Sequence, residues 1–163
     1  FQNNTAGAEV LVRLVAEALQ PEADEVLLDG YAGGGLFAAT IGRSCKRAIG
    51  VESDRIAAED YAHNTGTRAL KKPFEASAGM LPKKFDLAVV DPPRVGLGKP
   101  GVAVLVGGRP RAIAYVACDP ASFARDAHLL GERGYTLVWV QPVDMFPQTF
   151  HIELVGCFVP RMA

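Results

Sequence analysis

The chain has 163 residues, of which 49% are hydrophobic and 21% charged, a composition that suits one globular domain with its own core. No apolar run reaches the ~18 residues that span a membrane, and a net charge of −1 excludes a strongly basic surface over the whole molecule. Three cysteines in no framework spacing exclude a disulfide scaffold and favour the reduced cytoplasm. Three scattered histidines give no sign of a metal site.

Helical patterns alternate with apolar runs along the chain, which indicates a mainly parallel sheet flanked by helices. The first helix is predicted over residues 5–19, because Leu11, Leu14 and Val15 share one face and Pro21 follows. Further helices are predicted from a glycine-rich turn to about residue 43, at 54–64, after a mobile Gly/Pro-rich loop at 96–101, and at 120–130. Strands are predicted at 25–29, 47–51, 85–90, 112–117, 136–142 and 152–158, with a short edge strand near 72–75.

A glycine-rich turn, Asp29-Gly30-Tyr31-Ala32-Gly33-Gly34-Gly35, follows the first strand, where ligands bind in open α/β sheets. Gly33-x-Gly35-x-x-Ala38 also satisfies the dinucleotide fingerprint, which leaves a nicotinamide-dependent oxidoreductase open. Two features favour S-adenosylmethionine. Asp29 at the strand end would repel a pyrophosphate but not a sulfonium amino acid, and the turn follows a complete helix. Glu52, which ends the second strand, would hold both ribose hydroxyls.

Three later motifs each place one reactive side chain at or near a strand end. They are Asp91-Pro92-Pro93-Arg94, Tyr115-Val116-Ala117-Cys118-Asp119-Pro120, and the segment 144–153, which ends in Glu153. Turn chemistry, core packing and an edge-strand charge are the ordinary explanations for the carboxylate of Asp91, the thiol of Cys118 and the carboxylate of Glu153. Cys118, however, precedes a helix start, where backbone N–H groups favour a thiolate.

In this order, and with Phe1-Gln2-Asn3-Asn4 before them, the motifs resemble those of the S-adenosylmethionine-dependent RNA 5-methyluridine methyltransferases. The resemblance runs from residue 1 to about 158. It implies an α/β, class I (Rossmann-like) methyltransferase fold, with a seven-stranded, mainly parallel sheet, helices on both faces and an antiparallel last strand. Residues 1–163 would be the catalytic domain of a longer protein, without its N-terminal RNA-binding parts. We expect a cytoplasmic monomer that needs no metal and no membrane.

The resemblance also implies a reaction, the transfer of a methyl group to C5 of a uridine in tRNA or rRNA. Cys118 would attack C6 of the ring, Glu153 would remove the C5 proton, and Asp91 would position substrate and cofactor. The implied contacts with S-adenosyl-L-methionine are Gln2, Asp29, Tyr31, Gly33, Leu36, Glu52, Glu75 and Asp91. The implied contacts with the RNA are Arg94, Arg125 and His151, with Arg125 and Asp126 forming a structural or RNA-contacting pair.

Some residues depart from the family pattern. Gly30 and Gly34 replace larger apolar residues, at a cost of roughly 0.5–1 kcal/mol each in conformational entropy. Asp119 stands where asparagine is usual, and we expect it to cap the following helix rather than to raise the thiol pKa. Arg94 occupies the aromatic position of amino-methyltransferases, which disfavours N-methylation of a base. An N-methyltransferase and a non-catalytic cofactor- or RNA-binding module remain as alternatives.

Overall fold

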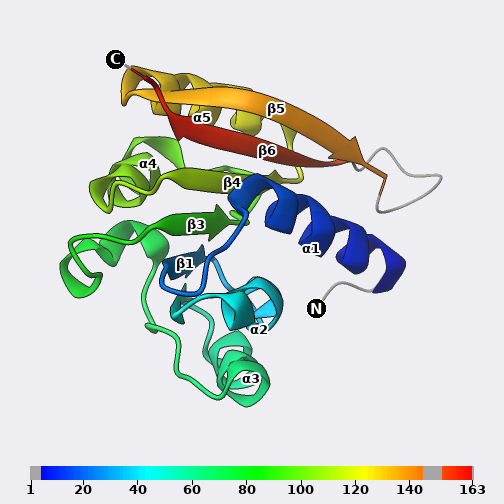
Figure 1. The fold of residues 1–163 in the computed structure, drawn as a ribbon, viewed down its shortest axis with the longest axis vertical. Coiled ribbons are helices and arrows are strands. Elements are labelled where there is room, and N and C mark those ends of the chain that lie inside the picture. Colours follow the sequence, from blue (N-terminus) through cyan, green and yellow to red (C-terminus); the bar gives the residue numbers. More distant parts are fainter. Residues whose placement is uncertain (1–4, 145–151, 163) are drawn as a thin grey trace.

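The structure is a computed structural model that describes residues 5–144 and 152–162 (Figure 1). In that part of the chain one mixed β-sheet is covered by helices on both faces. Its strands are β1 (Val26–Gly30), β2 (Arg47–Val51), β3 (Leu87–Val90), β4 (Ala112–Ala117), β5 (Tyr135–Val143) and β6 (Glu153–Pro160). Its α-helices are α1 (Thr5–Leu19), α2 (Leu36–Thr40), α3 (Arg55–Thr65), α4 (Gly98–Gly107) and α5 (Pro120–Glu132). None of these helices combines the length and the apolar character that crossing a membrane needs.

The strand order is β2-β1-β3-β4-β6-β5, and it confirms the predicted α/β methyltransferase fold with an antiparallel last strand. The strands β2, β1, β3 and β4 are parallel to one another. The last strand in the sequence, β6, runs antiparallel between β4 and β5, as Figure 1 shows. The carboxyl ends of the four parallel strands therefore lie at the same edge of the sheet as the first residue of β6.

The described residues form six strands rather than the expected seven, because the predicted edge strand near 72–75 is wrong. In its place a 3₁₀ turn runs over Phe74–Ala76, and pairing with β2 is limited to a bridge between Leu70 and Val51. Pro73 has no N–H to give to a ladder, and the Phe74 ring is buried in the core. These two residues turn the backbone inward where a strand would continue along the edge.

Helix α4 also differs from its prediction, since it begins at Gly98, inside the segment expected to be a loop. Pro100 lies in the first turn of the helix, where a missing N–H leaves no intrahelical bond unmade. The helix predicted to run to about residue 43 is shorter than expected. It ends as α2 at Thr40 and continues as a 3₁₀ turn over Ile41–Ser44.

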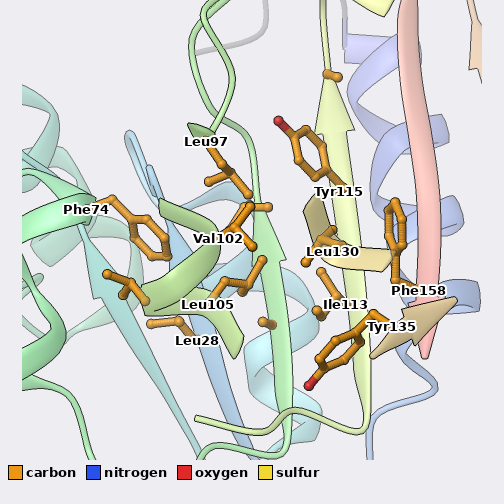
Figure 2. Close-up of a cluster of buried hydrophobic side chains, with 14 of the residues drawn as sticks. Leu28, Phe74, Leu97, Val102, Leu105, Ile113, Tyr115, Leu130, Tyr135 and Phe158 are labelled. Atoms are coloured by element: carbon orange, nitrogen blue, oxygen red, sulfur yellow. The ribbon is translucent and has the colours of Figure 1, made fainter. Parts of the chain in front are cut away.

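The two faces of the sheet bury separate apolar clusters. Helix α1 and the start of α2 cover one face, where Leu11, Val15 and Phe37 pack against β3, β4 and β6. Helices α4 and α5 cover the other face, and Figure 2 shows the larger side chains of that cluster. The two layers hold the sheet rigidly from both sides, so that its carboxyl edge carries loops on a fixed frame.

Candidate functional site

The carboxyl edge of the sheet brings together the strand-end residues singled out from the sequence. Tyr31, Glu52, Asp91 and Cys118 each come directly after the end of a parallel strand or within one residue of it. Glu153 is the first residue of β6. The β4–β6 register pairs Ala117 with Leu154, so that one further step along this antiparallel pair sets Cys118 opposite Glu153.

A cavity of about 840 Å³ opens between α1 and the glycine-rich turn. Four of the predicted cofactor contacts lie on its wall, namely Tyr31, Gly33, Leu36 and Asp91. Helix α1 supplies much of the opposite wall, and its contribution was not predicted from the sequence. A pattern in the sequence could have indicated it, because small and β-branched residues stand four apart on one face of that helix, at Ala8, Val12 and Ala16.

The glycine-rich turn is held in place by Glu52. Gly33 and Gly35 have φ angles of 52° and 83°, in the left-handed region that favours glycine. The Gly33 N–H donates to Glu52 Oε2 at 2.8 Å, and the Asp54 N–H donates to Glu52 Oε1 at 2.7 Å. Glu52 therefore joins the turn to the start of α3, and its carboxylate stays partly exposed beside the turn.

Gly30, a departure from the family pattern, has a physical explanation in this fold. A Cβ atom at Gly30 would lie 2.6 Å from Cε2 of the Phe74 ring. The ring of Phe74 also packs against Tyr31, with the ring centroids 5.0 Å apart, and the Tyr31 hydroxyl donates to Glu75. The turn at Phe74 and Glu75 thus joins the site through side-chain contacts rather than through strand pairing.

Asp29 lies beneath the turn rather than on the cavity wall. Its side chain is 1% exposed, and its Oδ2 accepts the Ala38 N–H at 3.0 Å in the first turn of α2. Gly35 at the N-cap has no side chain of its own, so Asp29 caps α2 from β1. Burial raises the pKa of Asp29 to about 8. A buried, largely protonated carboxyl group does not repel a pyrophosphate in the cavity, so that argument against a dinucleotide does not hold.

Asp29→Asn should flatten the dependence of stability on pH. The ordinary aspartate pKa is 3.8 and the folded value is about 8, so folding favours the protonated form. As the pH rises from 4 to 8, the unfolded chain releases this proton while the folded chain keeps it. Stability therefore falls, by at most about 1.4 kcal/mol per pH unit, and levels off above pH 8. The free energy of unfolding, measured with urea at several pH values from 4 to 8, should fall less steeply with pH in the variant than in the wild type. Equal dependence on pH in the two proteins would contradict the raised pKa of Asp29.

The resting environment of Cys118 does not favour a thiolate, contrary to the expectation from its place before a helix. Burial raises the pKa of the partly exposed thiol, and so do the Glu153 and Asp91 carboxylates, while Arg94 lowers it. At the start of α5, Asp119 Oδ2 accepts the Ser122 N–H at 2.7 Å, so this amide of the helix N-terminus is bonded to Asp119. The expectation that Asp119 caps this helix is confirmed.

The environment of Asp91 also disfavours the ionised form of its side chain. Burial and the neighbouring Glu153 carboxylate raise the pKa of Asp91 to about 7. A thiol and two carboxyl groups therefore stand close enough to affect one another electrostatically, and one of the three, Asp91, lies on the cavity wall. Because its pKa is displaced toward neutrality, Asp91 can donate or accept a proton under physiological conditions, as acid–base groups of catalytic sites do.

The predicted RNA contacts differ in their surroundings. Arg94 is exposed on the loop after β3. Arg125 is engaged with the protein itself, since its Nη2 donates to the Val95 carbonyl at 2.6 Å and to Asp126 Oδ1 at 2.8 Å. Gln2 and His151 lie outside the described residues, together with most of the third motif. Within residues 5–144 and 152–162, no three His, Cys, Asp or Glu side chains are grouped to hold a metal ion.

The known proteins to which the chain is similar in sequence include several RNA methyltransferases. An uncharacterized RNA methyltransferase of Gloeobacter violaceus is 36% identical over 160 residues, covering 96% of this chain and 35% of its own length. One of Streptomyces avermitilis is 39% identical over 171 residues, covering 98% of this chain and 39% of its own length. The chain belongs to this family of RNA methyltransferases. It spans little more than a third of the curated relatives it matches, and no protein-family model matches it.

This RNA methyltransferase chain is also similar to solved structures. The tRNA (uracil-54, C5)-methyltransferase of Pyrococcus abyssi, in complex with S-adenosyl-L-homocysteine, superposes with a TM-score of 0.79 at 35% identity. The match covers 98% of this chain and 40% of that one. An RNA methyltransferase structure from Pyrococcus horikoshii gives a TM-score of 0.73 at 16% identity, covering 95% of this chain and 82% of that one, which supports the fold alone.

Proposed function

We propose that this chain is the catalytic part of an enzyme that transfers a methyl group from S-adenosyl-L-methionine to C5 of a uridine in tRNA or rRNA. The single observation that carries the proposal is that the Cys118 thiol lies opposite Glu153 and close to Asp91, a residue on the wall of a cavity large enough for the cofactor. The similarity to a tRNA (uracil-54, C5)-methyltransferase supports the same base and the same ring position. The exposed Arg94 beside the thiol supports a polyanionic substrate.

The residues around the cavity fit S-adenosyl-L-methionine. Gly33, Gly34 and Gly35 of the turn lie on the cavity wall, and their lack of side chains lets the backbone approach a ligand closely. Gly35 also leaves room for the Tyr61 ring, from which a Cβ there would lie 2.8 Å away. The carboxylate of Glu52, beside this turn, has the two acceptor oxygens that a ribose diol needs. Tyr31 offers an aromatic ring on the cavity wall, and the buried Phe74 ring packs behind it. When bound, the cofactor supplies an electrophilic methyl group on a positively charged sulfur.

Uracil C5 is a weak nucleophile, and the proposed role of Cys118 is to activate it. After its proton passes to water, the sulfur adds to C6, and the C5=C6 π electrons move onto the ring as an enolate. C5 then accepts the methyl group. Glu153 removes the C5 proton, the C5=C6 double bond forms again, and the Cys118 sulfur leaves. Asp91, held at the end of β3, orients the reacting groups between cofactor and ring. The target base must leave its stack to reach the thiol.

Two other functions make different demands on the same residues. An N-methyltransferase needs no thiol nucleophile, so a thiol opposite Glu153 has no role in such a reaction. A non-catalytic binding module needs neither Cys118 nor Glu153. The arrangement of both on opposite positions of neighbouring strands therefore favours the uridine reaction.

The proposed product can be tested by mass spectrometry of nucleosides in RNA from cells that lack the full-length protein. We expect one 5-methyluridine site in tRNA or rRNA to be lost and to return when the intact gene is restored. Loss of an N-methylated base instead, or no change in any methylated nucleoside, would contradict the proposed function.

A further inference from the structure

The carboxylate of Asp126 is a meeting point of three segments of the site. Its side chain is fully buried, and it lies on α5, the helix that follows Cys118. Asp126 Oδ2 accepts the Leu97 N–H at 2.6 Å and the Tyr115 hydroxyl at 2.7 Å, and Oδ1 accepts the Gly98 N–H at 3.1 Å. Tyr115 lies on β4, three residues before Cys118, and Figure 2 shows it together with Leu97 in the same cluster.

Arg125 contacts the same carboxylate from the protein surface. Its Nε and Nη2 donate to Asp126 Oδ1 at 3.0 and 2.8 Å, and Nη2 also donates to the Val95 carbonyl at 2.6 Å. Between these contacts, Gly96 has a φ of 73°, and a Cβ there would lie 2.4 Å from Asp126 Oδ2 and 2.6 Å from Arg125 Nη2. The loop backbone therefore rests directly on the ion pair, and a side chain at Gly96 would push it away.

A buried carboxylate is costly unless its partners satisfy it, so its hydrogen bonds define where those partners must lie. Here the partners belong to the loop that carries Arg94 and to the strand that leads to Cys118. We propose that Asp126 is a positioning residue, which holds the loop over residues 94–98 so that the Arg94 guanidinium stays beside the Cys118 thiol. Its role in catalysis rests on the proposed function, whereas its role as an anchor of the loop does not.

The anchor can be tested through the pH dependence of Cys118 alkylation by iodoacetamide, read from the Cys118 peptide by mass spectrometry. The charged groups that face this thiol are Glu153 from β6, Asp91 after β3 and Arg94. In Asp126→Asn, the loss of a negative charge would by itself lower the thiol pKa. Release of Arg94 would raise it. We expect a higher pKa, with alkylation several-fold slower at neutral pH and faster amide exchange at Leu97 and Gly98.

Matched variants separate positioning from general destabilisation. Glu25→Gln breaks another largely buried carboxylate–arginine pair, in which Arg111 Nη2 donates to Glu25 Oε2 at 2.7 Å, at the opposite edge of the sheet. It should lower the unfolding temperature and leave the Cys118 pKa unchanged. Arg125→Lys, which keeps the charge but loses the two-pronged contact, should shift the Cys118 pKa in the same direction as Asp126→Asn, by less, if the anchor is real.

An unchanged or lowered Cys118 pKa in both Asp126→Asn and Arg125→Lys would overturn the proposal. If the alkylation rates of Cys118 differ between the wild type and the variants as expected, but the wild type forms no adduct with 5-fluorouridine RNA, the proposed function is wrong and the role of Asp126 as an anchor of the loop is supported. If it does form the adduct, Asp126→Asn should slow adduct formation by about a hundredfold, because misplaced reacting groups lose that much. Adduct formation at the wild-type rate would also overturn the proposal.

Discussion

Cys118→Ala is expected to abolish methyl transfer to uridine, with a loss of at least about a thousandfold, because no other group in the proposed mechanism can add to C6. Binding of S-adenosyl-L-methionine should stay within a few-fold, since Cys118 does not line the cavity wall. Transfer of radiolabelled methyl groups to RNA measures the first quantity, and calorimetric titration measures the second. Loss of turnover without loss of cofactor affinity is the pattern of a residue that acts in the chemical step.

Cys45 provides a matched control, because it is partly exposed, donates to the Ile41 carbonyl and lies just before the start of β2, away from the carboxyl ends of the strands. Cys45→Ala should leave methyl transfer unchanged. If Cys118→Ala also retains turnover, the covalent mechanism is wrong, and direct methylation of a nitrogen becomes the better account.

Glu153→Gln is expected to stop the reaction at a later point. Addition and methylation can proceed, but the C5 proton has no base to receive it, so the Cys118 sulfur cannot leave. A covalent protein–RNA complex should accumulate with ordinary uridine RNA, and turnover should fall by about 10²–10⁴-fold. Denaturing gel electrophoresis shows the complex directly. Absence of both turnover and complex would mean that Glu153 acts before addition, contrary to the proposal.

The same variant should change the thiol in a predictable direction. The Glu153 carboxylate raises the pKa of Cys118 and of Asp91, so that its neutralisation should lower both. Alkylation of Cys118 near neutral pH should therefore become faster in Glu153→Gln. Glu132→Gln, an exposed change at the end of α5, should leave the alkylation rate as it is.

The sequence was sufficient to predict that the residues of the proposed site lie at strand ends. Strands β2 and β4 have the predicted bounds, and the parallel order places the residues that follow them at one edge. The antiparallel last strand brings Glu153 to that edge from the opposite direction. Such predictions succeed because strand ends are local features, while the rule that parallel strands share a carboxyl edge is general.

The sequence could not predict where a residue is fixed by a partner far away in the chain. The prediction that Asp29 contacts the cofactor stays a prediction, but the sequence did not show that this carboxyl group is buried and accepts the Ala38 N–H of α2. Asp126 caps the start of α4 from 29 residues later, which is why a helix begins in a segment rich in glycine and proline. Phe74 turns inward because Gly30 leaves room for its ring. Nothing in the local pattern of these residues records those partners.

The most direct test of the covalent mechanism is tryptic mass spectrometry of the protein after incubation with S-adenosyl-L-methionine and an RNA that carries 5-fluorouridine at the target position. Fluorine at C5 cannot leave as a proton, so a methylated adduct should stay bound. We expect one modified peptide, the one containing Cys118, with the added mass of the methylated fluorinated nucleotide. An unmodified Cys118 peptide from protein that methylates the corresponding uridine RNA would contradict it.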